Sequence, residues 1–236
     1  MYTIKSEVRL SQAGHDGKMK LVSAVDLLQD CANSWIDNEK ILKDYMTKSE
    51  TGVFLTFRQL EVIRRPFYGE KLTTKSGVYL MKGFFGHRST VIYDENNKPC
   101  LKCYTIGAFI NLKAGNLIRL QEDIVNSVTY DEKVPMVEYA DKKIILPNEK
   151  FETLEPLAIL FNDIDFYKHV NNARYIEKAL NLLPLDFEVK HLRIEYKRAA
   201  KFGDLLYPKR LISNNHCFIL FNDIEEKPYA IIEMKK

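Results

Sequence analysis

The sequence lacks any apolar run of the roughly 18–20 residues that a membrane-spanning helix needs. Its first residues, Met1–Glu7, also lack the basic stretch and apolar core of a secretory signal peptide. Neither charge is in strong excess, since charged residues make up 28% of the 236 residues and the formal net charge is +3. This balance argues against a dedicated nucleic-acid-binding protein, which usually carries a strongly basic face. We therefore expect a cytoplasmic protein that binds neither membranes nor nucleic acid.

Cysteine is also scarce, with four residues in the whole chain. Cys100 and Cys103 form a C-x-x-C pair, but their surroundings are typical of a buried strand, on which residues three apart point to opposite faces. No second pair of Cys or His lies nearby, and the five histidines are scattered. The pattern favours structural thiols over a zinc or redox site.

Two segments recur in the same order, which indicates an internal duplication. Glu61–Leu72 resembles Glu195–Leu206 at an offset of 134 residues, with Glu, Arg, Gly and the final Leu identical. Val91–Leu101 resembles Leu220–Ala230 at an offset of 129, and both contain an acidic turn and Lys-Pro between two apolar runs. We expect these segments to superpose in register in two similar halves.

Each half is typical of one amphipathic helix followed by four or five strands. Apolar residues recur at helical spacing from Val22 to about Lys43, and again from Asn171 to Leu183, where Pro184 ends the pattern. The alternating segments that follow are 53–63, 71–81, 88–93 and 101–112 in the first half, and 191–197, 205–212, 217–221 and 229–234 in the second. Helices followed by runs of strands indicate an α+β fold with antiparallel sheets.

The segment from residue 163 to 175 carries most of the candidate chemistry. Within ten residues at the start of the second helix it places two carboxylates, a histidine and two asparagines: Asp163, Asp165, His169, Asn171 and Asn172. A carboxylate, an imidazole and the free amides of a helix are groups that activate water and stabilise an oxyanion. The alternative is a polar turn with an asparagine helix cap, since Asn is a favoured N-cap in any protein.

This run, Asp-x-Asp-x-x-x-His-Val-Asn-Asn-x-x-Tyr, with Glu195–Arg198 and Gly203–Asp204 after it, resembles the acyl-acyl carrier protein thioesterases. The first half adds Asp16–Leu21 and Leu27–Asp30 to the resemblance. The resemblance implies a tandem (double) hotdog fold of the α+β class, in which each half is one long helix wrapped by a curved antiparallel sheet. The expected parts are an N-terminal hotdog that houses the acyl chain (1–120), a connecting segment (121–150) and a C-terminal hotdog with the catalytic motif (151–236).

In that family the second hotdog carries the chemistry, and the pattern maps the catalytic Asp and His onto Asp165 and His169. The resemblance implies that His169 is the general base and that Asp165 orients it. Amides at Asn171 and Asn172 would hold the thioester oxygen. The family Asn position is Tyr167, which we include among the substrate-binding residues.

Two catalytic positions of the family are altered in this chain. The family Glu position is Ala199, followed by Ala200, and Tyr167 stands at the family Asn position. Glu195 shares the predicted strand with Ala199, but four residues span roughly 13 Å, which disfavours it as a replacement. We expect Ala199 to lie on a strand that passes the start of the helix, Tyr167 to fill the space beside it, and hydrolysis to be weak.

The resemblance implies a thioesterase that converts acyl-acyl carrier protein, an acyl-phosphopantetheine thioester, to free fatty acid and carrier protein, with no metal or organic cofactor. One alternative is an acyl-coenzyme A thioesterase of the same fold. A second is a non-catalytic acyl-binding protein, which the changes at Ala199 and Tyr167 favour. In the first half, Met19 is the rough equivalent of His169, so that half has no Asp–His pair in its turn.

The implied carrier protein is acidic as a class. Five cations at the ends of predicted strands are candidates to dock it, namely Arg64, Arg65, Lys197, Arg198 and Lys201. The alternative is that these are solvated charges. We expect a monomer or a homodimer of double hotdogs, and the acyl chain length is not encoded in any motif of the sequence.

Overall fold

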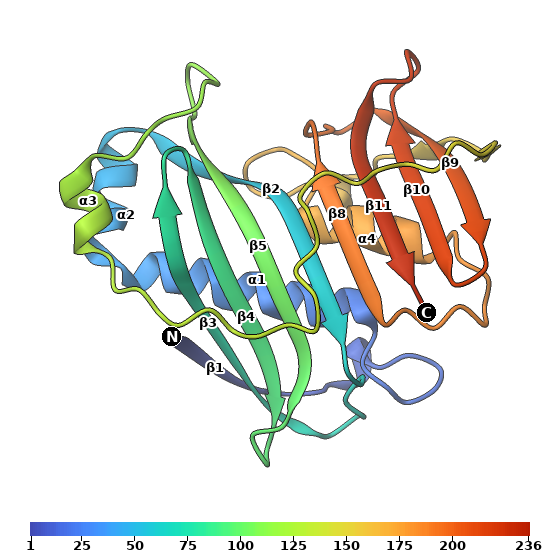
Figure 1. Ribbon diagram of the computed structural model, residues 1–236, viewed down its shortest axis with the longest axis horizontal. Coiled ribbons are helices and arrows are strands. Elements are labelled where there is room, and N and C mark those ends of the chain that lie inside the picture. Colours follow the sequence, from blue (N-terminus) through green and yellow to red (C-terminus); the bar gives the residue numbers. More distant parts are fainter. The chain divides into compact units, whose positions relative to one another are not determined.

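The computed structural model describes residues 1–236, and the chain separates into two compact units, residues 1–138 and residues 139–236. Each unit combines helices with antiparallel strands (Figure 1). The first unit contains β1 (Tyr2–Glu7), η1 (Leu10–Gln12), α1 (Leu21–Asn38), α2 (Lys40–Lys48), β2 (Thr51–Val62), β3 (Lys71–Lys82), β4 (Phe85–Asp94), β5 (Pro99–Asn111) and α3 (Glu122–Ser127). The second contains β6 (Glu152–Thr153), β7 (Leu157–Ala158), η2 (Phe161–Asp163), α4 (Asn172–Leu180), β8 (His191–Tyr196), β9 (Leu205–Ser213), β10 (His216–Asn222) and β11 (Pro228–Lys235).

In the first unit the strand order is β1-β3-β4-β5-β2, and every neighbouring pair is antiparallel. Helix α1 lies across one face of this sheet and contacts β1, β3 and β4 (Figure 1). The residues that α1 buries against the sheet include Ala24, Val25, Leu28, Cys31 and Trp35. Their spacing forms one stripe along the helix, which is why this segment folds as an amphipathic helix on the sheet.

In the second unit the strand order is β8-β11-β10-β9, again antiparallel, and the two-residue strands β6 and β7 both pair with β9. Helix α4 packs against β11 and buries Ala173, Tyr175, Ile176 and Ala179. The second unit therefore repeats the arrangement of a helix against an antiparallel sheet.

The helices are shorter than the sequence pattern suggested. The first predicted helix is two helices, because the chain leaves helical geometry at Glu39 (φ −82°, ψ 78°). Helix α4 ends at Leu180, since Pro184 disfavours helical backbone at Leu183. It has 9 residues against the 18 of α1. No helix in the chain has both the length and the apolar character to cross a membrane.

The two units share one strand register. Glu61 on β2 lies opposite Lys102 on β5, and Glu195 on β8 lies opposite Ile231 on β11. These pairs are offset by 134 and 129 residues, as are the two duplicated sequence segments. The predicted superposition of the two halves is therefore confirmed.

Two turns also repeat between the units. Gly69 and Gly203 both take the left-handed conformation, with φ of +82° and +89°, which glycine adopts without steric cost. Asp94 Oδ1 accepts hydrogen bonds from the amides two and four residues later, and Asp223 Oδ1 does the same. Both acids sit before a Lys-Pro pair, so the duplicated acidic turn is a duplicated structure.

The duplicated glutamates anchor the segment that connects the two halves. The Val137 amide donates a hydrogen bond to Glu61 at 3.0 Å within the first unit. Within the second unit the Ile144 amide donates to Glu195. The two glutamates are 6% and 3% exposed, so each binds the connecting segment in a buried place. The connecting segment thus covers part of the outer sheet face in each unit.

All four cysteines are free and buried. Burial raises the pKa of the Cys31, Cys100, Cys103 and Cys217 thiols to about 11. These thiols are protonated at neutral pH, and the thiolate is the reactive and metal-binding form. The structure therefore agrees with structural thiols.

Candidate active site

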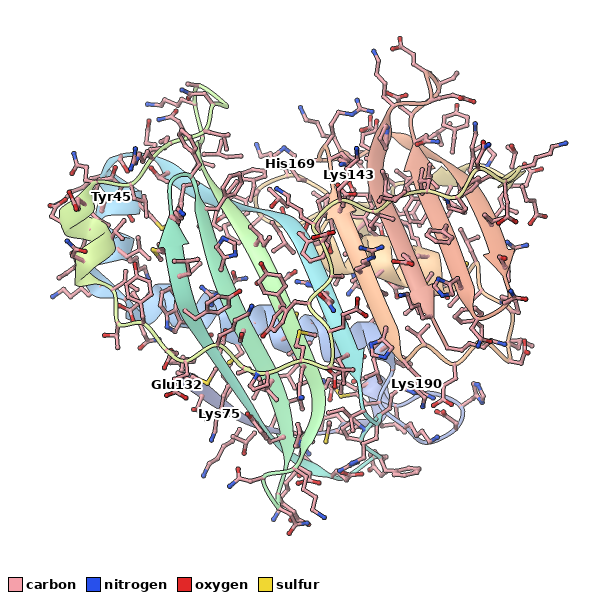
Figure 2. The ribbon with its side chains drawn as sticks, in the orientation of Figure 1. Tyr45, Lys75, Glu132, Lys143, His169 and Lys190 are labelled. Atoms are coloured by element: carbon pink, nitrogen blue, oxygen red, sulfur yellow. The ribbon has the colours of Figure 1, made fainter.

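The candidate residues lie in a tight turn between η2 and α4, residues 163–171, here called the site turn (Figure 2 labels His169). The Asp165 amide donates a hydrogen bond to the His169 carbonyl at 2.9 Å, which joins the two arms of the turn. Lys168 closes the turn in a left-handed conformation, with φ of +64°. The backbone of the site turn therefore places Asp165 and His169 opposite each other.

The Asp165 carboxylate stabilises this turn. Its Oδ1 accepts hydrogen bonds from the amides of Tyr167 at 2.9 Å and His169 at 3.4 Å. Aspartate commonly stabilises a turn in this way, by bonding its side chain to the amide two residues later. Asp165 thus fixes the backbone that carries the half-buried His169 side chain. Its further role, orienting the imidazole, stays a prediction.

Asn171 and Asn172 fix the start of α4. Asn171 is the N-cap: its Oδ1 accepts from the Ala173 amide at 2.9 Å, and its own amide donates to the Asp163 carbonyl at 2.8 Å. The Asn172 carbonyl accepts from the Tyr196 hydroxyl at 3.1 Å. The capping interpretation of Asn171 is confirmed. The start of the helix also presents free amides and the positive end of the helix dipole, so a role in binding the substrate oxygen stays a prediction.

The site turn is fastened to the chain that follows β8. The Val170 amide donates to the Ala200 carbonyl, and the Ala200 amide donates to the Tyr175 hydroxyl, each at 2.9 Å. Tyr175 is 2% exposed, and burial raises the pKa of its hydroxyl. A buried, neutral tyrosine at this place supports the site turn, and its ring packs on Tyr196 and Phe221 of the sheet.

Ala199 and Tyr167, the two altered positions, both lie at the surface. Ala199 is exposed and lies in the loop after β8. The sequence pattern predicted it on the strand, and that prediction is wrong. The strand ends at Tyr196 because the next two amides both donate to the Tyr229 carbonyl, which breaks the regular pairing. Tyr167 is 49% exposed and packs on Phe166, with ring centroids 4.0 Å apart. That Tyr167 fills the space beside Ala199 stays a prediction.

The first unit contains the same turn with different side chains. The Gly14 amide donates to the Lys18 carbonyl at 2.8 Å, as the Asp165 amide does to the His169 carbonyl. Gly14 and Lys18 thus occupy the positions of Asp165 and His169. The equivalent of His169 is therefore Lys18, and the prediction of Met19 is wrong by one residue. The helix pattern alone does not fix the alignment of the two turns, whereas their matching hydrogen bonds do.

The first unit also shows what the two altered positions can do together. The residues that match Tyr167 and Ala199 are Asp16 and Arg65, and the Arg65 guanidinium donates to the Asp16 carboxylate. In the shared register we expect side chains at positions 167 and 199 to be able to meet, which stays a prediction for the second unit. In this chain neither residue of this pair of positions is a carboxylate or an amide.

Asp163 has a structural role that the sequence analysis left unassigned. It is 8% exposed, its Oδ2 accepts from the Leu160 amide at 2.8 Å, and it pairs with Lys178 at 2.9 Å. Asp163 therefore begins the site turn and ties it to α4. The signal in the sequence is its spacing, since an acid three residues into a short helix commonly reaches back to the amide that precedes it.

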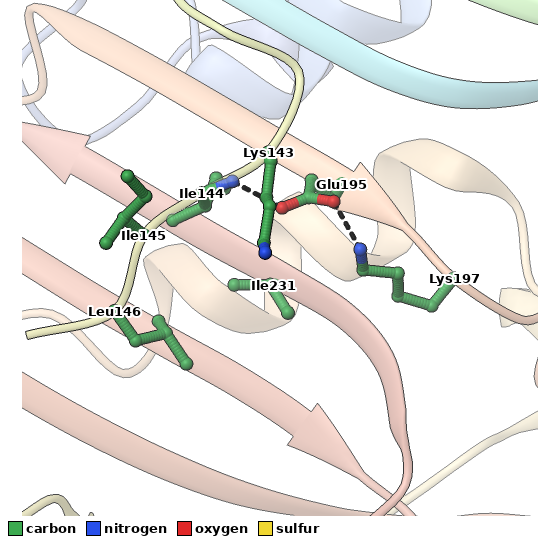
Figure 3. Close-up of a pocket in the computed structure, with 7 residues that line it drawn as sticks. All are labelled: Lys143, Ile144, Ile145, Leu146, Glu195, Lys197 and Ile231. Carbon is green, nitrogen blue, oxygen red and sulfur yellow. Dashed lines mark hydrogen bonds and ion pairs between the residues drawn. The ribbon is translucent and has the colours of Figure 1, made fainter.

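Glu195 lies on the sheet face that points away from α4. Its neighbour Tyr196 reaches α4, and successive strand residues point to opposite faces. Figure 3 shows the Glu195 carboxylate bonded to the Ile144 amide and to Lys197, beside a pocket of about 490 Å³. Glu195 is thus part of the contact with the connecting segment. Nowhere in the chain do three His, Cys, Asp or Glu side chains gather as a metal ion would need.

Exposed aromatic side chains lie in the site turn and in the segments that adjoin it. Phe161, Phe166 and Phe202 are 80%, 82% and 65% exposed, and together with Tyr167 they are here called the aromatic rim. The rings of Phe161 and Phe202 meet edge to face, with centroids 6.4 Å apart. Clustered exposed apolar side chains mark interaction surfaces more often than isolated ones do.

Most of the cations considered for docking are held in ion pairs. The pairs are Arg64 with Glu70 and Asp94, Arg65 with Asp16, Lys197 with Glu195, and Arg198 with Asp223. Lys201 is exposed, and so is Lys168 at the tip of the site turn. Both lysines adjoin the aromatic rim in sequence, so the rim carries two cations.

Known protein families match both units of the chain. Residues 1–128 match the acyl-ACP thioesterase N-terminal domain, and residues 147–219 match the acyl-ACP thioesterase C-terminal domain. A chloroplastic acyl-[acyl-carrier-protein] hydrolase of Cuphea viscosissima is 23% identical over 206 residues, which cover 81% of this chain and 50% of that protein. The chain spans about half the length of the curated relatives it matches.

Two solved structures share the fold of the chain. An acyl-ACP thioesterase from Bacteroides thetaiotaomicron has a TM-score of 0.88 at 19% identity, covering 99% of this chain and 96% of that one. A 12:0-ACP thioesterase from Umbellularia californica has a TM-score of 0.88 at 15% identity, with the same coverage of both chains. The predicted tandem hotdog fold is confirmed.

Proposed function

Because the chain belongs to the acyl-ACP thioesterase family, whose N- and C-terminal domains its two units match, we propose that it hydrolyses acyl-acyl carrier protein to free fatty acid and carrier protein. The observation that carries the proposal is the site turn, which holds Asp165 and His169 opposite each other before α4. The matching turn of the first unit has Gly14 and Lys18 instead, so the second unit is the one that offers a base.

In this proposal His169 is the general base for a water molecule. The imidazole takes a proton as the water oxygen attacks the thioester carbon, and the carbonyl electron pair moves onto oxygen. The backbone amide of Asn172 stabilises that oxyanion, helped by the dipole of α4. The backbone amide of Asn171 is donated to the Asp163 carbonyl, so Asn171 contributes through its side-chain amide. When the tetrahedral intermediate collapses the C–S bond breaks, and the imidazolium returns its proton to the thiolate. Asp165 holds His169 in place throughout.

We expect this hydrolysis to be weak. The pair of positions formed by Tyr167 and Ala199 supplies neither the amide nor the carboxylate that the family places there, so nothing at this pair positions the attacking water. Loss of a group that acts only in the transition state commonly lowers kcat by orders of magnitude. The same loss favours the alternative, a non-catalytic acyl-binding protein, whereas the retained Asp165 and His169 favour an enzyme.

We propose the aromatic rim as the surface that receives the carrier protein. Its exposed apolar rings and the neighbouring Lys168 and Lys201 complement a partner surface that combines apolar and acidic side chains. Coenzyme A has no protein surface to cover these rings. The aromatic rim can therefore distinguish a thioesterase that acts on acyl-acyl carrier protein from one that acts on acyl-coenzyme A.

The test compares the same acyl group on two carriers. We expect kcat/KM for decanoyl-acyl carrier protein to exceed that for decanoyl-coenzyme A by about tenfold or more. A Phe161→Ser/Phe166→Ser variant should lose about tenfold with the carrier protein and keep its rate with coenzyme A. The matched control is Phe84→Ser, an exposed phenylalanine of the first unit, which should leave both rates unchanged.

Each outcome of this experiment favours one of the candidate functions. Equal rates with the two carriers, unaffected by the rim variant, would favour an acyl-coenzyme A thioesterase. Tight acyl binding with no turnover of either substrate would favour the non-catalytic protein.

A further inference from the structure

A row of polar side chains crosses the sheet of the first unit on the face that α1 covers. Arg58 on β2 lies opposite Thr105 on β5, and Thr105 lies opposite Arg88 on β4. Directly opposed residues of an antiparallel sheet share a face. Both arginines reach α1: Arg58 Nη2 donates to Gln29 at 3.4 Å, and Arg88 Nη1 donates to the Ala32 carbonyl. The interior of the first unit therefore contains two guanidinium groups.

Arg88 makes no ion pair, although the Glu39 carboxylate acts on its charge from a distance. Besides the Ala32 carbonyl it donates to the Ser76 hydroxyl at 3.3 Å, and its guanidinium lies 4.5 Å from the centre of the Trp35 ring. It is 9% exposed, and burial lowers the pKa of its guanidinium to about 10. A buried positive charge next to neutral partners favours an anion nearby.

Arg58 is less satisfied than Arg88. It is 3% exposed, and its Nε and Nη1 atoms are buried with no hydrogen-bond partner. Its hydrogen bond to Gln29 is long at 3.4 Å, and the neutral Cys103 thiol lies within its reach. Buried charged groups are nearly always paired or fully hydrogen-bonded, because leaving a donor unmade carries a large desolvation cost. Thr105 between the two arginines is only half-buried.

The second unit places apolar residues in the same row. In the shared register Arg58, Thr105 and Arg88 correspond to Leu192, Met234 and Cys217, which are mutually opposite on β8, β11 and β10. Leu192 is 1% exposed, and the other two are 0% exposed. The fold thus accepts an apolar row at these positions, so the arginines are not a requirement of the hotdog architecture.

We propose that the row formed by Arg58, Thr105 and Arg88 binds the negatively charged end of an acyl chain, a carboxylate at the carbon farthest from the thioester. The proposal rests on the proposed function and on the expectation, implied by the family resemblance, that the first unit houses the acyl chain. The carboxylate oxygens accept from the unsatisfied donors of Arg58 and from the Thr105 hydroxyl, and Arg88 supplies the second positive charge. A methyl end would leave the Arg58 donors buried and unpaired.

The first experiment compares two acyl-carrier substrates of equal length, decanoyl and 9-carboxynonanoyl. We expect the wild-type protein to prefer the carboxylate-ended substrate in kcat/KM by at least about tenfold, because a methyl end leaves the polar groups of the row unpaired. Arg58→Met should abolish that preference. The control is Arg9→Met, an exposed arginine of the same unit that pairs only with Glu7, which should keep it.

The second experiment measures binding of two ten-carbon amides by calorimetry, 9-carbamoylnonanoate and decanamide, which differ only in having a carboxylate or a methyl group at the end far from the amide. We expect 9-carbamoylnonanoate to bind wild type about tenfold more tightly than decanamide does, and the two to bind Arg58→Met equally. Thermal unfolding of Arg58→Met checks that the variant is folded, and Arg88→Met provides a second variant of the row.

The two experiments separate this inference from the proposed function. If neither thioester is hydrolysed but binding of 9-carbamoylnonanoate depends on Arg58, the row is an acid-binding site and the hydrolase proposal fails. If decanoyl-carrier protein is hydrolysed at least as well as the carboxylate-ended substrate, and the Arg58→Met variant leaves the ratio and the binding unchanged, the inference is overturned and the hydrolase proposal stands.

Discussion

The first and second units of this chain share strand order, register and turns, yet they place their polar side chains differently. In the first unit the row across the sheet interior contains Arg58 and Arg88, and the turn before α1 contains Gly14 and Lys18. In the second unit the interior row is apolar, and the polar groups gather in the site turn. The strand register and turns that both units share therefore determine the backbone fold. The positions of polar side chains can differ between the two units without changing that fold.

The apolar interior of the second unit suits it to carry a site. Ile194, Ile219 and Ile232 lie opposite one another on β8, β10 and β11, and each is 0% exposed. A close-packed layer of this kind has low compressibility and gives the unit a rigid interior. The clamp formed by Ala200 and Tyr175 then fixes the turn to the layer. Positioning by rigid elements is what a catalytic pair needs.

The largest expected effect comes from substitutions at the matched turns of the two units. His169→Ala should lower kcat for acyl-carrier hydrolysis by about a thousandfold, or about 4 kcal/mol, because it removes the general base. Lys18→Ala, at the matching position of the first unit, should leave kcat unchanged. The measurement is single-turnover hydrolysis of decanoyl-acyl carrier protein. Wild-type turnover by the His169→Ala protein would show that the base lies elsewhere.

The next largest effect comes from placing the family residues at the two altered positions of the second unit. Ala199→Glu with Tyr167→Asn should raise kcat by at least about tenfold, or about 1.4 kcal/mol. The matched residues of the first unit, Asp16 and Arg65, are in contact, so side chains at these two positions can meet. The double change is used because we expect the phenol of Tyr167 to occupy the space that the new Glu requires.

The control for this gain is Ala199→Gln with Tyr167→Asn, which has the same size but lacks the charge and should give no increase in kcat. A fast natural protein, slowed by the double change to Glu and Asn, would mean that another group already does the work assigned to the family Glu. Asp204, which lies beyond Ala199 and accepts from the Lys201 amide at 2.9 Å, is the first residue to examine in that event.

The fold was predictable from the sequence because its signals are local. Alternating strands, Lys-Pro turns and the repeated Glu and Gly positions identified both sheets and their common register. The site turn was predictable for the same reason, since its residues are contiguous. The break at Glu39 was not foreseen, because the apolar stripe continues past it into α2 and only the backbone angles reveal it.

Two features depend on tertiary contacts that local patterns do not contain. The end of β8 is set by the two amides that share the Tyr229 carbonyl, so Ala199 could not be placed in a loop from sequence alone. The buried position of Arg58 is a second case. The connecting segment covers the outer face of β2, so Gln59 and Glu61 are buried as well as Arg58, and strand alternation no longer tells inside from outside.

A smaller effect concerns how each unit begins its helix. Asn171 caps α4 with its side chain, whereas Lys20, the N-cap of α1, makes no side-chain cap. Asn171→Ala should lower the free energy of unfolding by about 1 kcal/mol. Lys20→Ala should change it by less than about 0.5 kcal/mol. Urea unfolding followed by circular dichroism measures both, and equal losses would contradict the difference between the two helix starts.

The smallest expected effect concerns the arginines that hold the duplicated turns. Arg64 in the first unit donates to Glu70 at 3.0 and 2.8 Å and to Asp94 at 3.0 Å, whereas its equivalent, Arg198, pairs with Asp223 alone among the carboxylates. The hydrogen bonds from Arg64 hold the pKa of Glu70 below its ordinary value of 4.5. A carboxyl group with a lowered pKa in the folded state stabilises the fold above that ordinary value, and the stabilisation is lost as the pH falls through the lowered pKa.

Arg64→Met should therefore cost up to about 1 kcal/mol of stability at pH 7, since the pair is partly exposed, and progressively less as the pH falls below about 4.5. Arg198→Met should cost less at pH 7, because it releases one carboxylate instead of two. Melting temperatures at pH 7 and pH 3 provide the test, with each variant compared to the wild-type protein at the same pH. A loss for Arg64→Met that is as large at pH 3 as at pH 7 would show that the guanidinium stabilises the turn by packing rather than by charge. A larger loss for Arg198→Met would show that the acidic turn of the second unit depends on its arginine more than that of the first.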